Sequence, residues 1–154
     1  MAVQAVKDYF AKYGMEDRVL ELDESSATVE LAAQALHCEP GRIAKTLSFL
    51  VEEQPVLVVT AGNARIDNAK YRHTFHEKAK MLKPDEVLKQ IGHAVGGVCP
   101  FAVKEGVKVY LDQSLKEYES VYPACGSSNS AIELTIPELE EYSSYLEWVD
   151  VCKE

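Results

Sequence analysis

The sequence predicts a single α+β domain, in which about seven short strands, several of them in hairpins, are covered by helices. Three observations lead to this fold class. Apolar residues alternate along several short segments, as they do in half-buried strands, and in other segments they recur at helical spacing. The chain has 154 residues, which is enough for one domain with its own core. We find no internal repeat, linker or low-complexity segment, so we treat residues 1–154 as one domain.

Six segments are expected to be helical, and most carry a recognisable start or stop signal. Thr28 precedes an apolar face of small residues and is the expected N-cap of its helix. Pro84 suits the first turn of another helix, and Gly92 its end. The expected helices are 3–13, 29–36, 67–78, 84–91, 113–119 and one that Pro137 opens.

Short strands are expected between these helices. Two strongly apolar strands are separated by a turn at 52–55, which favours an antiparallel hairpin. The second of them is apolar on both faces, as is typical of a central strand covered on both sides. The expected strands are 18–22, 43–51, 56–61, 107–111, 120–123, 132–136 and 148–151.

The composition excludes several classes of protein. Apolar residues make up 47% and charged residues 27%, as in ordinary globular proteins. No apolar run approaches the ~20 residues of a membrane span, and the N-terminal residues do not resemble a secretory signal, so we expect a cytoplasmic protein. A net charge of −9 argues against coating nucleic acid by charge alone, but a local basic pocket could still grip one end of a nucleic acid.

Lys45 is the most unusual residue of the first hairpin strand. Side chains alternate between the two faces of a strand, which puts Lys45 on the same face as Leu47 and Phe49. A charge on an apolar face is costly unless it is paired or reaches a wet pocket. The side chain therefore either snorkels at the strand end or lines a cavity and holds an anion.

Two loops rich in glycine and small polar residues stand out. Residues 93–101 contain Gly96, Gly97 and Pro100, which are incompatible with a regular central strand. Residues 124–130 form a second turn-forming stretch. The first loop could be a plain turn, or its backbone could come close to a ligand, because glycine has no side chain in the way. The hydroxyls and free backbone amides of the second could bind a polar group of a ligand.

The sequence contains no obvious nucleophile. The GxSxG, Walker, GxGxxG and HExxH patterns are absent, and no two cysteines have CxxC spacing. Cys99 could pair with a histidine, although it precedes a proline in a loop. His73 and His76 could face one metal ion, but no third ligand is near in the sequence. A site of this kind can still hydrolyse an activated ester by positioning water and stabilising an oxyanion with backbone amides.

The basic residues of the chain are densest at 70–80. This stretch holds Lys70, Arg72, His73, Lys78 and Lys80 in an otherwise acidic chain. A run of charge is usually a solvated surface. The alternative is a local contact for the phosphates of a nucleic acid.

Several motifs occur together in a characteristic order. They are residues 28–33 (TVELAA), 43–49 (IAKTLSF), 58–62 (VVTAG), 96–101 (GGVCPF), 109–112 (VYLD) and 126–134 (GSSNSAIEL). Together they resemble the YbaK/ProX aminoacyl-tRNA deacylases, which are related to the editing domain inserted in bacterial prolyl-tRNA synthetases. The resemblance covers residues 1–152.

The resemblance implies a fold, a function and a set of site residues. The implied fold has a mixed, mostly antiparallel, barrel-like sheet surrounded by helices. Members of this family hydrolyse the ester between a wrong amino acid and tRNA, in trans and without a metal or organic cofactor. Lys45 matches the family lysine expected to engage the tRNA acceptor end, and Gly96 and Pro100 match the GxxxP loop expected to position the ester. The residues expected to contact substrate are Thr46, Gly97, Cys99, Gly126, Ser127, Ser128 and Asn129.

The identity of the substrate is less defined. The expected substrate is tRNA-Pro carrying a small wrong amino acid such as Ala, Cys or Ser. Residues 18–22 lack the tyrosine of some cysteinyl-specific members, which argues against that specificity. Two alternatives stay open: a non-catalytic aminoacyl- or nucleotide-binding module that docks on a synthetase, and a thiol-dependent hydrolase that uses Cys99.

Overall fold

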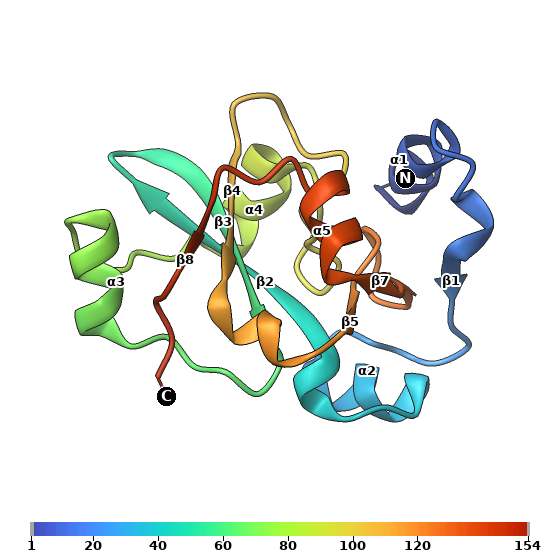
Figure 1. Ribbon diagram of the computed structural model, residues 1–154. Coiled ribbons are helices and arrows are strands. Elements are labelled where there is room, and N and C mark those ends of the chain that lie inside the picture. Colours follow the sequence, from blue (N-terminus) through green and yellow to red (C-terminus); the bar gives the residue numbers. More distant parts are fainter. Residues whose placement is uncertain (1, 154) are drawn as a thin grey trace.

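The computed structural model describes residues 2–153 as a mixed six-stranded sheet with helices around it and a separate two-stranded sheet (Figure 1). The six-stranded sheet has the order β7-β5-β2-β3-β4-β8, and β1 pairs with β6. The strands are β1 (Val19–Glu21), β2 (Ile43–Val51), β3 (Gln54–Ala61), β4 (Lys108–Asp112), β5 (Ser120–Pro123), β6 (Ser130–Ile132), β7 (Leu134–Thr135) and β8 (Glu147–Val149).

The helices lie where the sequence predicts them, and most are slightly shorter. Thr28 caps its helix as expected, because its hydroxyl accepts the Leu31 N–H at 3.2 Å. Residues 113–117 form a 3₁₀-helix and not an α-helix. The α-helices are α1 (Ala2–Ala11), α2 (Val29–Leu36), α3 (Asn68–Phe75), α4 (Pro84–Ile91) and α5 (Ile136–Tyr142), and the 3₁₀-helices are η1 (Glu16–Arg18), η2 (Pro40–Arg42) and η3 (Gln113–Glu117). None of the described helices is long and apolar enough to cross a membrane.

The hairpin of β2 and β3 forms the centre of the sheet. Leu50 pairs with Pro55 and Val51 with Gln54, so the loop contains only Glu52 and Glu53. Both loop residues have positive φ, as a type I′ turn requires. The predicted antiparallel hairpin is therefore confirmed, with a tighter turn than expected.

The mixed α+β fold and the curled, barrel-like sheet are confirmed, but the pairing is less antiparallel than expected. Strand β2 pairs with β5 in parallel, and β4 is parallel to both β3 and β8. Parallel pairing needs a long crossover. Residues 62–107 supply one between β3 and β4, and they carry α3 and α4.

The strand expected over 132–136 is divided between two sheets. Residues Ser130–Ile132 pair with β1, whereas Leu134–Thr135 pair with β5. Ile136 already begins α5, because Thr135 and Glu138 form a capping box. The chain thus passes from one sheet to the other at Glu133.

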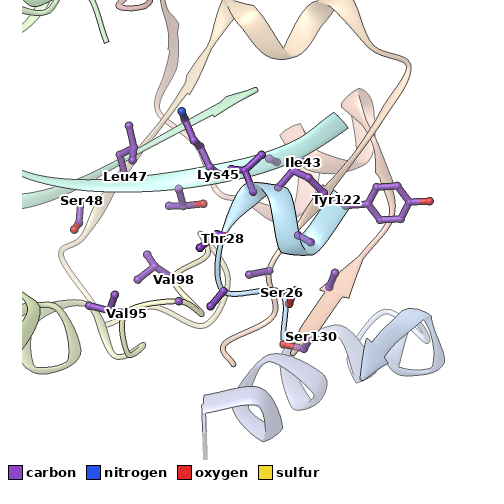
Figure 2. A pocket seen from close by; sticks show the side chains of 18 of the residues that line it. Ser26, Thr28, Ile43, Lys45, Leu47, Ser48, Val95, Val98, Tyr122 and Ser130 are labelled. Carbon is purple, nitrogen blue, oxygen red and sulfur yellow. The ribbon is translucent and has the colours of Figure 1, made fainter. Parts of the chain in front are cut away.

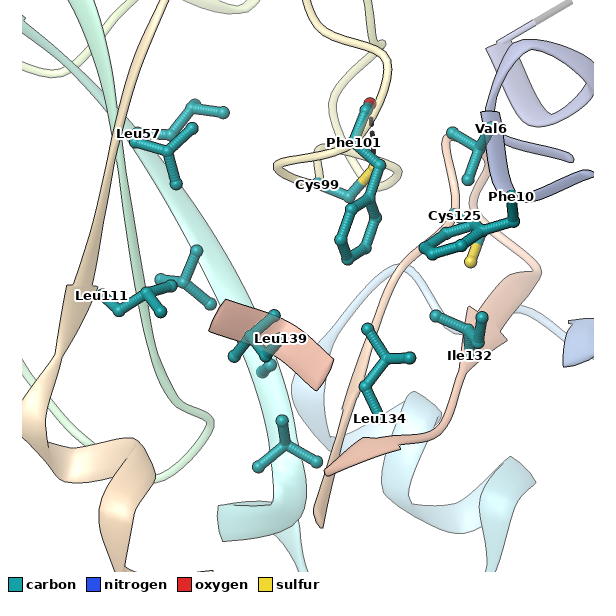
Figure 3. Close-up of a cluster of buried hydrophobic side chains, with 14 of the residues drawn as sticks. Val6, Phe10, Leu57, Cys99, Phe101, Leu111, Cys125, Ile132, Leu134 and Leu139 are labelled. Atoms are coloured by element: carbon teal, nitrogen blue, oxygen red, sulfur yellow. Dashed lines mark hydrogen bonds between the residues drawn. The ribbon is translucent and has the colours of Figure 1, made fainter. Parts of the chain in front are cut away.

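The sheet has a different apolar cluster on each face. Leu57 and Val59 belong to the larger cluster, beneath α1 and α5, which Figure 3 shows with Phe10 and Phe101. Val56 and Val58 belong to the second cluster, which contains Tyr71 of α3. Strand β3 is therefore covered on both faces, as its sequence predicts.

Candidate functional site

A cavity of about 330 Å³ lies along the outer edge of β2 (Figure 2). Its walls come from residues 26–29, α2, the 43–48 part of β2, the start of α4 and the loop at 95–98. Most of the lining side chains are apolar. Among the described residues, no carboxylate, imidazole or thiol lines it.

The cavity occupies a gap in the hydrogen-bonding partners of β2. On its outer edge, β5 pairs only with Ile43 and Ala44. A partner returns further along, where the Leu82 N–H donates to the Ser48 carbonyl at 3.2 Å. Thr46 lies between these two points. The backbone N–H and C=O groups of alternate strand residues point to the same edge. The N–H and C=O of Thr46 therefore point to the same edge as those of Ala44 and Ser48, and they face the gap.

Lys45 lies beside the cavity, but its ammonium points away from the 95–98 loop. In Figure 2, Lys45 and Leu47 project to one side of β2, and Ser48 projects towards Val95 and Val98 on the other. The Lys45 ammonium donates to the Ala64 carbonyl. Burial lowers the pKa of Lys45. The resemblance implies that Lys45 and the loop with Gly96 and Pro100 belong to one site, but the ammonium does not face that loop here.

Of the predicted loop glycines, only Gly96 reaches the cavity. It has a φ of +93°, a backbone conformation that favours glycine. Gly97 instead approaches the second loop: a Cβ on it would lie 2.6 Å from the Gly126 carbonyl carbon and the Ser127 nitrogen. The Gly126 N–H also donates to the Gly97 carbonyl at 3.0 Å. Gly97 and Gly126 thus join the two loops to each other and do not contact the cavity.

Cys99, which was expected to contact substrate, and Pro100 are both buried, and neither lines the cavity. Figure 3 shows the Cys99 side chain pointing towards Phe101 and the core. Complete burial raises the pKa of the Cys99 thiol to about 12.

His93 cannot activate this thiol in the present arrangement. Its Nε2 lies 3.5 Å from the Cys99 sulfur and 2.7 Å from the Phe101 carbonyl. A carbonyl only accepts, so Nε2 carries the proton and cannot take one from the thiol. The geometry therefore disfavours the thiol-dependent mechanism.

Ser127, Ser128 and Asn129 do not line the cavity. Ser128 and Asn129 instead bond to the segment before α2. The Ser128 carbonyl accepts the Ser26 N–H at 2.6 Å, and the Asn129 amide donates to the Leu22 carbonyl at 3.1 Å. These bonds fix the segment before α2, from which Ser26 lines the cavity.

Sequence reasoning missed most of the apolar wall. Met81, Leu82, Val87 and Val95 line the cavity, although their sequence pattern is that of ordinary helix and loop residues. Tyr122 joins them from β5. The one available signal was the TVELAA motif, whose small residues in α2 include Ala32 of the cavity wall.

The basic stretch at 70–80 divides into two parts. In α3, Lys70 pairs with Asp150 at 3.2 Å, and the helix covers the second apolar cluster. After α3 the chain reaches the cavity, where exposed Lys80 and Lys83 flank the lining residues Met81 and Leu82. Lys80 and Lys83 are therefore adjacent in the chain to residues of the cavity wall. Among the described residues, no group suited to a metal ion is present at His73 and His76.

Comparisons with known proteins agree with this architecture. Residues 23–142 match the model of the aminoacyl-tRNA editing domain. The uncharacterized protein YwhH of Bacillus subtilis is 52% identical over 155 residues, which cover 100% of this chain and 99% of that protein. The proline–tRNA ligase of Shouchella clausii is 30% identical over 104 residues, which are 67% of this chain but only 18% of the ligase.

A solved structure shares the whole fold. It is provisionally described as a trans-editing enzyme for prolyl tRNA synthetase, has a TM-score of 0.88 and 28% identity, and the match covers 99% of this chain and 98% of that one. The family resemblance expected from the motifs is thereby confirmed. With a family model that matches most of its length, the chain belongs to the aminoacyl-tRNA editing domain family.

Proposed function

We propose that this protein is a trans-acting aminoacyl-tRNA deacylase, which removes a wrong amino acid from tRNA. One observation carries the proposal: in an editing domain, an apolar cavity of about 330 Å³ opens on an unpaired strand edge. This volume is at the small end of ligand sites and suits an aminoacyl group.

The reaction requires no protein nucleophile. Water attacks the ester carbonyl, the bond between that carbon and the ribose oxygen breaks, and the ribose oxygen takes up a proton. The substrate ester is already activated, so orienting the water and stabilising the oxyanion are the main tasks. Backbone groups of Gly96 and of the β2 edge are the candidates for both, since no carboxylate, imidazole or thiol lines the described cavity.

Lys45 is the proposed holder of the tRNA acceptor end. The cavity includes both Lys45 and Thr46, which project to opposite faces of β2, so it wraps around the open edge of the strand. A phosphate on the Lys45 side would replace the Ala64 carbonyl as the partner of the ammonium. A charge-assisted bond to phosphate is stronger than one to a neutral carbonyl.

The substrate class follows from the cavity and from the relatives. The wall is mostly apolar, and Lys45 is the one charged residue among the described residues that line it, so the cavity suits a small uncharged side chain, such as that of Ala, Cys or Ser. Prolyl-tRNA is the context in which related domains occur, so tRNA-Pro is the proposed carrier and a prolyl-tRNA synthetase a candidate partner. A reaction on charged tRNA would occur in the cytoplasm.

The decisive experiment incubates the protein with tRNA-Pro charged with alanine, cysteine or serine, and with a broad panel of other misacylated tRNAs. Lys45→Ala should abolish release while circular dichroism shows an intact fold. Lys104→Ala is the matched control, because the Lys104 ammonium also donates to a backbone carbonyl, that of Lys89, but does not line the cavity. No release from any substrate would exclude the deacylase.

A second candidate is a non-catalytic module that binds an aminoacyl group. It is favoured by the absence of a carboxylate, imidazole or thiol from the described cavity wall. Calorimetric binding of an aminoacyl-adenosine without hydrolysis across the panel would support this alternative.

A further inference from the structure

The outer edge of β2 is unpaired at one place, and the cavity lies there. Paired residues flank this place on both sides, with Ala44 held by β5 and Ser48 held by the Leu82 N–H. At about 3.4 Å per residue, the interval is long enough for one residue of an added strand. The strand edge therefore offers one donor and one acceptor, at Thr46, that the described protein does not use for pairing.

The Thr46 hydroxyl is also without a partner. Its oxygen is covered from solvent and has no hydrogen bond within the described protein. Three other hydroxyls at the cavity have protein partners: Ser26 donates to Ser128, Thr28 accepts from Leu31, and Ser130 donates to Ser127. Among the described residues that line the cavity, Thr46 is the one whose side-chain oxygen is both covered from solvent and without a partner. A buried hydroxyl without a partner costs stability, which makes Thr46 the exception at this cavity.

We propose that the open interval of β2 at Thr46 is the subsite that binds the α-amino group and the ester carbonyl of the aminoacyl ligand. The inference rests on the proposed function, because it concerns how the same cavity holds its substrate. The Thr46 carbonyl and hydroxyl accept from the α-ammonium, and the Thr46 N–H donates to the ester carbonyl.

The chemistry of the cavity wall supports this assignment. An aminoacyl ester carries a cationic ammonium next to its carbonyl, and a carboxylate would be the usual partner for that charge. No carboxylate lines the described part of the cavity, so neutral oxygens must receive the ammonium. The strand edge at Thr46 supplies such oxygens together with a donor, in the same pattern that an added strand would use.

The covered hydroxyl can reach such a ligand by a change of rotamer. Threonine populates more than one χ1 well, and a rotation of about 120° exchanges the hydroxyl with the methyl group. Thr46 as a whole is half-buried and lines the cavity although its oxygen is covered. The ligand would then provide the partner that the hydroxyl lacks in the free protein.

Thr46→Val tests the inference with two readouts that move in opposite directions. Valine keeps the shape and removes the unpartnered hydroxyl, so the unfolding temperature should rise by about 2–4 °C. Binding of 3′-deoxy-3′-(L-alanylamino)adenosine, an amide that is not hydrolysed, should weaken about tenfold because a bond to a charged group is lost. The analogue with a propionyl in place of the alanyl group lacks the ammonium, and its affinity should not change.

Two control variants complete the calorimetric titrations. Thr46→Ser keeps the hydroxyl and should restore binding of the alanyl analogue. Thr60→Val removes a buried hydroxyl that already donates to the Ala61 carbonyl at 3.1 Å. It should lower the unfolding temperature without changing the affinity for either analogue.

The inference and the proposed function can fail separately. If wild type hydrolyses misacylated tRNA but Thr46→Val binds the alanyl analogue as well as wild type does, the inference is wrong and the deacylase stands. Equal weakening for both analogues, or no binding of the alanyl analogue to wild type, would also overturn the inference. Binding that depends on Thr46 without hydrolysis of any tRNA would support the inference and exclude the deacylase.

Discussion

Gly97→Ala is the most direct test of how the two glycine loops shape the cavity. Gly97 does not have a positive φ, so alanine fits its backbone conformation. The added Cβ would lie 2.6 Å from the Gly126 carbonyl carbon and 2.8 Å from the Ser127 Cα. These are backbone atoms, which cannot turn aside as a flexible side chain could. The loops must therefore separate.

The size of the effect follows from these distances. Restoring ordinary contact at 3.4 Å from 2.6 Å requires a shift of about 0.8 Å. Overpacking of this kind costs about 1–3 kcal/mol. Weakening of the bond from the Gly126 N–H to the Gly97 carbonyl lowers the free energy of unfolding by about 1 kcal/mol more. Alanine also restricts the unfolded chain, which raises the free energy of unfolding by about 0.5–1 kcal/mol. We expect a loss of roughly 2–3 kcal/mol, which is a fall of roughly 4–12 °C in Tm for a domain of this size.

Thermal unfolding of Gly97→Ala and of Gly106→Ala measures the difference. Gly106 has a φ of +92°, but a Cβ there meets nothing within 4 Å, so its substitution costs only backbone strain of about 1–2 kcal/mol. Deacylation per folded molecule should fall in Gly97→Ala, because Gly96 and Val98 of the cavity wall move with the loop. A Gly97→Ala protein that melts within about 1 °C of wild type would show that the loops are not in tight contact.

Three further predictions concern other residues of the chain. Cys99→Ala should keep deacylation within about twofold while lowering Tm, because the thiol with its pKa of about 12 is a core group; a loss of activity far beyond its loss of folded protein would bring back the thiol mechanism. Glu138→Gln should cost about 1 kcal/mol at pH 7, since Arg18 holds the pKa of Glu138 at about 2. The stability that this carboxylate adds is complete above its ordinary pKa and is lost as the pH falls towards 2, so urea titrations of the two proteins should converge in acid. Lys80→Glu should raise KM for charged tRNA and flatten the dependence of log KM on log salt, whereas an unchanged slope would remove Lys80 from the phosphate contacts.

The local elements were predictable because their signals are local. Pro84 at the start of α4 and Gly92 at its end, with a φ of +103°, mark that helix within one turn on each side. Thr28 marks α2 in the same way. Such signals depend on hydrogen bonds between residues that are close in the sequence. These bonds form whichever elements the helix packs against in the folded protein.

Apart from the β2–β3 hairpin, strand pairing was not predictable from the same kind of evidence. The parallel contact of β3 with β4 depends on a crossover of residues 62–107, and nothing in either strand reports its direction. The alternating pattern of Ile132, Leu134 and Ile136 predicts one strand, yet two sheets and a helix share it. Alternation shows that side chains are half-buried, but it does not identify the element that covers them.

The same limit explains the partial success at the site. Glycine at positions 97 and 126 correctly signalled a close backbone approach, but the approach is between two loops and not towards a ligand. The alternation in β2 correctly grouped Lys45 with Leu47 and Phe49. It could not tell which face the cavity lies on, because that depends on residues 81–98, which are distant in sequence.

The strand edge resolves the conflict between the expected and observed positions of Lys45. Consecutive residues of a strand point to opposite faces, so a ligand at an open edge can meet Lys45 on one side and Thr46 on the other. An aminoacyl nucleotide has this division, with a neutral side chain and ammonium at one end and a phosphate at the other. In the proposed function the cavity would receive the first end, and the Lys45 ammonium, which now donates to the Ala64 carbonyl, would bind the second. Lys45 therefore need not point into the cavity to act on the ligand that fills it.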